Sequence, residues 1–151
     1  SILVCARMAQ RLMRLGFLYC RTYAPYSKWF GTAFSRLPLD KTIKDEIRKA
    51  LKASGSEERE ASIAQAQKDM ADLHNALGIT DQVPVEITSY FGRSSKVIFA
   101  DRIANACRQQ LRGTSLEDIP LIGSLSGVEN FTALSDNTAH RLRRKHLYER
   151  N

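Results

Sequence analysis

The sequence has few cysteines and none of the common catalytic motifs. It holds three cysteines in 151 residues, of which we expect Cys5 and Cys107 to be small core residues, and none of them form a C-x-x-C pair. This small, odd number argues against a disulfide framework and favours a reducing, cytoplasmic setting. No H-E-x-x-H, G-x-S-x-G, G-x-G-x-x-G or D-x-D motif occurs, and the carboxylates are not clustered as a two-cation catalytic site requires. We therefore expect no catalytic residue, no metal site and no cofactor in this chain.

The chain also lacks a long uninterrupted apolar run and an initiator methionine. Residues 2–20 are apolar with helical spacing, but Arg7, Arg11 and Arg14 lie in the middle of this stretch. Charges at the centre of a membrane span are costly, and a signal peptide needs an unbroken apolar core, so we expect no membrane association. The start at Ser1 favours an internal helix of a longer protein, cut at or near its beginning.

Acidic residues are missing from the beginning of the sequence. Six basic residues precede Asp40, which is the first acid, and the formal net charge of the chain is +7. Arginines on a half-buried helix need acidic or phosphate partners, so we expect carboxylates of the third or fourth helix to pair with them. A bound polyanion or a missing domain is the alternative partner. The content of 43% hydrophobic and 26% charged residues is ordinary for a soluble protein, and we expect residues 1–151 to form one domain.

The spacing of apolar residues predicts an all-α fold, a bundle of five to seven helices. The first two helices are expected at residues 2–23 and 25–35. Asp40 caps the third, and the fourth extends from a cap at Ser56 to a stop at Gly78. Two more helices are predicted at residues 95–111 and 136–149. The last belongs to a basic terminal helix or tail, residues 136–151. Its charge resembles a nucleic-acid-binding patch, but it lacks interleaved aromatic residues, and a solvated helix is the favoured interpretation.

Aromatic residues concentrate in the stretch from Arg21 to Phe34. Four of them follow helical spacings of three, four and four, namely Tyr23, Tyr26, Phe30 and Phe34. This stripe favours a core face over a ligand site. Lys28 and Trp29 point elsewhere on that helix, and with Arg21 they suit one wall of a site for a base or sugar and its phosphates.

Two other places are weaker candidates for a site. Gly92–Lys96 precedes the predicted helix 95–111, where Arg93, two hydroxyls and backbone amides suit a phosphate, although ordinary capping by a serine is the favoured interpretation. His74 and Asn75 fall in the last turns of the fourth helix. We interpret His74 as a polar surface or dipole-satisfying residue rather than a catalytic base.

Several blocks of the sequence resemble an uncharacterised bacterial family. ARMAQRLMRLGFLYCRTYAPYSKWFGTAF, LHNALGIT, SKVIFADRIANAC and IPLIGSLSGVENFTALSD follow the order of a family whose helical domain of unknown function follows a nucleotidyltransferase-like fold. APYSKWFGTAF, residues 24–34, is the most specific block. The resemblance implies a cytoplasmic protein whose upstream half carries a glycine-serine and carboxylate motif and, with it, Mg²⁺ and a nucleoside triphosphate. Related folds such as aminoglycoside nucleotidyltransferases close one side of the acceptor pocket with a C-terminal helical bundle.

By that analogy, the chain binds a nucleotide or small-molecule acceptor, or shapes the cleft beside the missing N-terminal domain. The candidate substrate- or phosphate-binding residues are Arg14, Arg21, Tyr26, Lys28, Trp29, His74, Asn75, Arg93 and Arg102. The leading hypothesis is a non-catalytic substrate-recognition or cleft-completing helical domain of a nucleotidyltransferase-like protein. The alternatives are a nucleic-acid-binding module, favoured by the charge, and a protein-interaction domain in which the first helix docks on a partner.

Overall fold

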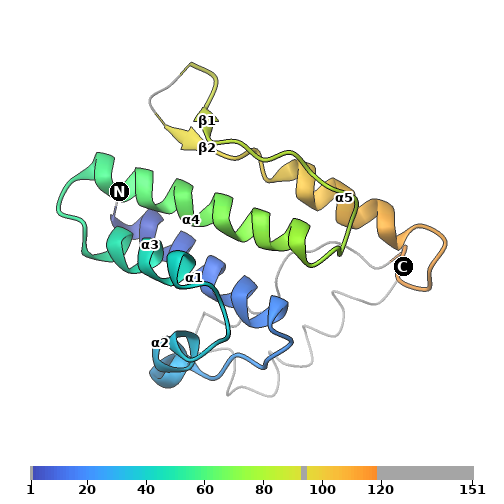
Figure 1. The fold of residues 1–151 in the computed structure, drawn as a ribbon, viewed down its shortest axis with the longest axis horizontal. Helices are drawn as coiled ribbons and strands as arrows, with labels where there is room; N and C mark the ends of the chain where they lie inside the picture. The colour runs from blue at the N-terminus through green and yellow to red at the C-terminus, as the bar shows by residue number, and fades with distance from the viewer. Residues whose placement is uncertain (1, 93–94, 119–151) are drawn as a thin grey trace, which may run out of the picture. The chain divides into compact units, whose positions relative to one another are not determined.

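The fold is almost entirely helical, which confirms the predicted all-α class. The computed structural model describes residues 2–92 and 95–118 (Figure 1). Its elements are α1 (Ile2–Tyr19), α2 (Ser27–Ser35), α3 (Lys41–Lys52), α4 (Ser56–Ala76), β1 (Thr88–Ser89), β2 (Lys96–Val97) and α5 (Asp101–Leu111). The chain divides into a compact unit of residues 1–110 and a second unit from residue 111, described as far as Asp118. The predicted helix 136–149 and the basic segment 136–151 lie outside the described residues.

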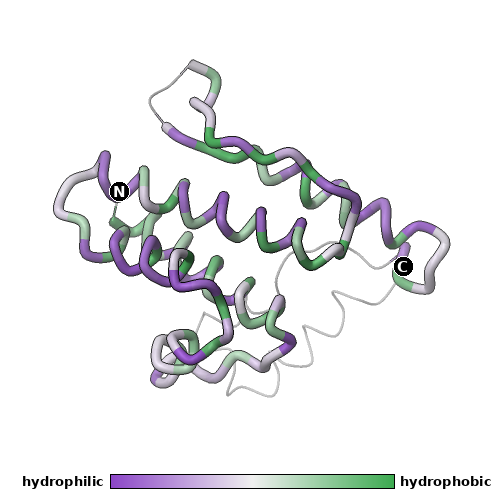
Figure 2. Tube along the Cα trace, in the orientation of Figure 1, coloured by the Kyte–Doolittle hydropathy of each residue, from purple (hydrophilic) through white to green (hydrophobic). Residues whose placement is uncertain are grey.

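Three helices, α1, α3 and α4, form the centre of the first unit. The Sγ of Cys5 lies 3.7 Å from the carbonyl oxygen of Ala50, which joins the start of α1 to the end of α3, so these two helices are antiparallel. The hydroxyl of Tyr19, at the end of α1, contacts His74 near the end of α4, so α1 and α4 run in the same direction. Hydrophobic and hydrophilic residues alternate within the turns of these helices (Figure 2), as expected where each helix buries one face.

The second helix, α2, packs against the C-terminal end of α1 because Gly16 leaves room for it. A Cβ atom at Gly16 would lie 2.8 Å from Cδ1 of Leu39 and 3.0 Å from a ring carbon of Phe34. Phe17 stacks on Phe30, with ring centroids 5.4 Å apart, and its ring centroid is 6.3 Å from that of Phe34. The chain itself therefore closes this end of α1 with aromatic rings.

Two helix boundaries are confirmed where a single residue sets them. The side chain of Asp40 accepts a hydrogen bond of 2.8 Å from the backbone N–H of Thr42 at the start of α3. Hydrogen bonds from the backbone N–H and from the hydroxyl of Thr42 lower the pKa of the Asp40 carboxyl, because they stabilise its charged form. Gly78 has a φ of +60°, the left-handed conformation that commonly follows a helix.

Other boundaries differ from the prediction. The first helix ends at Tyr19 instead of residue 23, because Arg21 adopts a φ of +48° and the N–H of Thr22 bonds back to the carbonyl of Phe17. α2 begins at Ser27 instead of residue 25. Ser56, predicted to cap the fourth helix, is its first residue, and the N-cap position holds a glycine without a side-chain hydrogen bond.

The helix predicted over residues 95–111 is wrong for its first six residues. β2 pairs there with β1 as an antiparallel hairpin, in which Thr88 is opposite Val97. The backbone N–H of Lys96 also donates 2.7 Å to a carboxylate oxygen of Glu60, on α4. Both contacts join residues far apart in sequence, so local apolar spacing does not reveal them. α5 begins only at Asp101, an acid suited to the first turn of a helix.

The predicted aromatic core stripe is half correct. Phe30 and Phe34 are buried, but Tyr23 and Tyr26 are exposed, since both precede the first residue of α2 and do not share its helical face. On α3, Leu51 continues the four-residue spacing of the buried Ile43 and Ile47, but it is exposed, and Ala50 is buried instead. Among the described helices, none has both the length and the apolar character needed to cross a bilayer.

Candidate functional site

The residues predicted to form a site fall into separate groups in the structure. Arg21, Tyr26, Lys28 and Trp29 lie on or beside the connection between α1 and α2, and all four are exposed. The others are placed elsewhere: Arg14 on α1, His74 and Asn75 at the end of α4, and Arg102 exposed in the first turn of α5. Arg93 lies outside the described residues. The structure therefore contains no single site made of the predicted residues.

His74 is a core residue, which corrects the prediction of a polar surface residue. Only 2% of its surface is exposed. The hydroxyl of Thr80 donates to the carbonyl oxygen of Asp81 at 2.8 Å, so it must accept at 3.0 Å from Nε2–H of His74. Nδ1 then carries the lone pair and accepts the Tyr19 hydroxyl proton across 3.1 Å. Both ring nitrogens have hydrogen-bond partners inside the fold, so the imidazole is structural.

Tyr19 keeps its proton to a higher pH than an ordinary tyrosine. Burial raises the pKa of its phenol to about 12, with a smaller contribution from Cys107. Its proton is therefore held for the hydrogen bond to His74.

Asn75 also has a structural role. Its amide nitrogen donates to the carbonyl of Val83 at 2.8 Å, and its amide oxygen accepts from the N–H of Val83 at 3.0 Å. This pair of bonds holds the segment after α4 in the same way as the backbone of a neighbouring strand, with one donor and one acceptor. His74 and Asn75 together anchor that segment and leave no free polar atom for a substrate.

Arg7, Arg11 and Arg21 do not find the carboxylates predicted for them. Over the described residues, no ion pair joins these three arginines to α3 or α4. Three acids of those helices bind neighbours on the same helix instead: Asp45 pairs with Lys41 and Arg48, Glu46 with Lys49 at 3.8 Å and Asp72 with Lys68 at 2.7 Å. Arg14 is half-buried, and its guanidinium carbon lies 5.5 Å from the centre of the Phe30 ring. Arg7, Arg11 and Arg21 are exposed, and no ion pair within the described residues offsets their positive charge.

The phosphate site considered at Gly92–Lys96 does not lie at a helix N-terminus. Lys96 belongs to β2 and α5 begins only at Asp101, while Arg93 and Ser94 lie outside the described residues. The N–H of Lys96, one of the amides expected to face a phosphate, donates to the carboxylate of Glu60. That amide is therefore already occupied.

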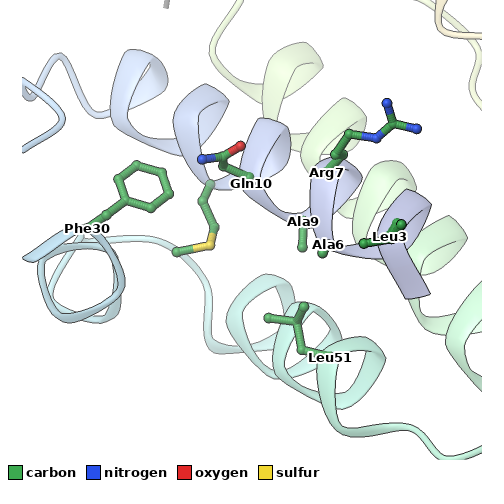
Figure 3. A pocket seen from close by; sticks show the side chains of 8 residues that line it. Leu3, Ala6, Arg7, Ala9, Gln10, Phe30 and Leu51 are labelled. Atoms are coloured by element: carbon green, nitrogen blue, oxygen red, sulfur yellow. The ribbon is translucent and has the colours of Figure 1, made fainter. Parts of the chain in front are cut away.

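An apolar groove of about 600 Å³ opens beside α1, where α2 and α3 approach it (Figure 3). Eight residues line it: Leu3, Ala6, Arg7, Ala9, Gln10, Met13, Phe30 and Leu51. Most are apolar, and none carries a negative charge. Two of its large apolar side chains, Leu3 and Leu51, are exposed.

The groove was not among the predicted sites, although residues that line it recur in the sequence at helical spacing. Leu3, Ala6, Gln10 and Met13 follow one another by three, four and three residues, the seam on which a second helix packs. The inner face of α1 is a different set, Cys5, Ala9, Leu12, Gly16 and Phe17. Small and apolar residues on two faces of one helix are the signal that could have indicated a second contact surface.

A smaller cavity of about 320 Å³ lies between the start of α1, the start of α4 and the hairpin. Its polar lining includes Arg59, Glu60 and Lys96. Two of these are already engaged: a nitrogen of Arg59 donates to the carbonyl of Ala53 at 2.6 Å, and Glu60 accepts from the backbone of Lys96.

The cysteines do not form a reactive centre. All three are free, with Cys5 buried as predicted and Cys107 only half-buried on a helix that has no fully buried residue. Burial raises the pKa of the Cys5 and Cys107 thiols, so both are protonated at neutral pH. In the part of the chain that the structure describes, no group of three His, Cys, Asp or Glu residues is placed to hold a metal ion.

These surfaces suit binding better than catalysis. The described residues offer an apolar groove beside α1 and an exposed aromatic and basic connection between α1 and α2. His74, the histidine considered as a base, is fully occupied by structural hydrogen bonds. Comparisons with protein-family models, with curated proteins and with solved structures found no significant match to this chain.

Proposed function

We propose that the chain is a non-catalytic helical interaction domain whose α1 groove receives an acidic amphipathic helix of a neighbouring domain. The observation that carries the proposal is the apolar groove of about 600 Å³ beside α1. Its seam residues repeat at the spacing with which two helices interlock their side chains. A helix laid along α1 would cover Leu3 and Leu51, which water now contacts.

The positive charge around the groove favours an acidic helix as its occupant. α1 and α2 contain no acidic residue, and Arg7 lines the groove itself. A helix with glutamates flanking its apolar stripe would pair with Arg7 and Arg11, which are exposed and have no ion pair within the described residues. A second copy of this chain would bring more positive charge to the same place, since the net charge is +7.

The resemblance to the nucleotidyltransferase-like family suggests where such a helix comes from. In this proposal the partner is the upstream domain, which holds Mg²⁺ and the nucleoside triphosphate, and the present chain completes the cleft beside it. The gene sequence ahead of Ser1 tests this part. A glycine-serine pair followed by D-x-D in the same reading frame supports it, and a frame without both motifs removes the transferase component.

The groove itself is tested with synthetic helices. A peptide with leucines at the seam positions and flanking glutamates is titrated into the protein by calorimetry, beside the same peptide with lysines in place of the glutamates. We expect binding of the acidic peptide and at least tenfold weaker binding of the basic one. Equal binding of both peptides, or a stable dimer of the protein alone in sedimentation, would contradict the proposal.

Two leucines of α1 provide a matched pair of variants. Leu3 and Leu18 are 74% and 71% exposed, but only Leu3 lines the groove. Leu3→Ser should weaken binding of the acidic peptide by about ten- to a hundredfold, because a leucine that becomes buried contributes about 1.5–3 kcal/mol. Leu18→Ser should leave the affinity unchanged. An equal effect of both substitutions would show that the peptide binds somewhere other than the groove.

A further inference from the structure

The connection between α1 and α2 contains an arginine where the backbone favours glycine. Arg21 has a φ of +48°, with its N–H bonded to the carbonyl of Leu18 and that of Thr22 bonded to the carbonyl of Phe17, each at 2.9 Å. This is the motif that usually ends a helix with a left-handed glycine. A residue with a Cβ is strained there, so folding alone does not explain the arginine.

The same connection exposes three aromatic rings within seven residues. Tyr23 is 95% exposed, Tyr26 is exposed, and Trp29 is 53% exposed in the first turn of α2. The Nζ atom of Lys28 lies 5.7 Å from the centre of the Trp29 ring. A cation beside an uncovered aromatic face is the arrangement in which proteins stack bases and hold the attached phosphates.

The charges at this connection lack an opposite partner among the described residues. Across residues 2–92 and 95–118, neither Arg21 nor Lys28 takes part in an ion pair, and the first acid of the sequence is Asp40. Asp40 is already engaged, since its carboxylate accepts hydrogen bonds from the backbone and hydroxyl of Thr42. A negatively charged ligand would supply the missing ion-pair partner for Arg21 and Lys28.

We infer that the segment Arg21–Trp29 binds a nucleobase together with its phosphate. In this arrangement the base stacks on the Trp29 ring, and Arg21 and Lys28 contact phosphate oxygens. A free nucleotide and a single strand of RNA or DNA share this chemistry. The inference does not depend on the groove, which is lined by other residues, on α1, α2 and α3.

Trp29 makes the test direct, because it is the one tryptophan of the chain and its fluorescence reports stacking. The probes are adenosine monophosphate and a short single-stranded oligoadenylate, with adenosine and ribose 5-phosphate as the separate halves. At low salt we expect quenching by both complete probes and weaker binding of each half. A much tighter oligonucleotide with steep salt dependence identifies a single strand as the source, and comparable affinities identify a free nucleotide. Absence of quenching by both complete probes would overturn the inference.

Three variants separate the site from general charge attraction. Arg21→Gly should raise the unfolding temperature by relieving the backbone, yet weaken both complete probes several-fold, a combination that damage to the fold cannot produce. Lys28→Gln should also weaken them several-fold. The control is Lys52→Gln, an exposed lysine at the end of α3. Unchanged affinity in Arg21→Gly, or equal losses in Lys28→Gln and Lys52→Gln, would show that the probes do not use this site.

Discussion

The two ends of α1 differ in how far the chain covers their apolar side chains. At the C-terminal end, Gly16 and Phe17 are buried under α2 and Tyr19 is bonded to α4, although Leu18 is exposed. At the N-terminal end, Cys5 is buried against α3, but Leu3 is exposed where it lines the groove. We call the first the closed end, because α2 covers it, and the second the open end, because its groove face has no covering element among the described residues. Single exposed apolar residues are ordinary on protein surfaces. The exposed apolar residues at the groove indicate a contact surface because they lie together.

The largest effect that would test this comparison is the loss of an aromatic ring at the closed end. Phe17→Ala removes a buried ring that packs on Phe30 and Phe34, and we expect it to lower the free energy of unfolding by about 3–5 kcal/mol. Leu3→Ala, at the open end, should change it by about 0.5 kcal/mol or less. Urea denaturation of both variants measures the difference.

Similar losses in Phe17→Ala and Leu3→Ala would break the comparison, because they would show that the chain itself covers the open end in solution. A small loss for Phe17→Ala alone would show that α2 is not held by its aromatic contacts.

A second effect belongs to the closed end and depends on pH. The pKa of Tyr19 is raised by burial to about 12 in the folded protein, against an ordinary value near 10. The unfolded chain therefore loses this proton first, and the folded state becomes less stable as pH rises from about 10 to 12. Two pKa units correspond to about 2.7 kcal/mol, which we reduce to about 1–2 kcal/mol because the ring is partly exposed.

Tyr19→Phe is the control for this pH dependence. The variant lacks the ionising group, so its free energy of unfolding should fall less over the same alkaline range. It should also be less stable at neutral pH by about 1–2 kcal/mol, because Nδ1 of His74 loses its donor. Urea denaturation at several pH values follows both. Identical alkaline losses in the two proteins would show that another group causes them.

Features set by neighbouring residues could be predicted from the sequence. Asp40 starts a helix and Gly78 ends one because capping and left-handed backbone depend on single residue types. The helical class followed from apolar spacing for the same reason. The left-handed Arg21 could not be predicted, since glycine is the usual residue there, and it shortens the first helix.

Features that join distant residues were beyond the sequence. The burial of His74 depends on Tyr19 and Thr80, and the hairpin depends on pairing with β1 and on Glu60. Of the candidate site residues, those at Arg21–Trp29 lie together because they are neighbours in sequence. The groove could not be predicted in the same way. Its prediction requires that two faces of α1 are recognised as contact surfaces, and that α2 and α3 are known to leave one of them open.

The smallest effect separates two glycines that helix propensity alone treats alike. Gly31 lies inside α2 with no atom within 4 Å of a built Cβ, so Gly31→Ala should raise the free energy of unfolding by about 0.5–1 kcal/mol. Gly16→Ala gains the same propensity but forces Leu39 and Phe34 to move, which costs about 1–3 kcal/mol, so it should be neutral or destabilising. Thermal unfolding of the two variants decides between them. If Gly16→Ala stabilises the protein as much as Gly31→Ala, then α2 does not press closely on α1, and the closed end differs less from the open end than the packing indicates.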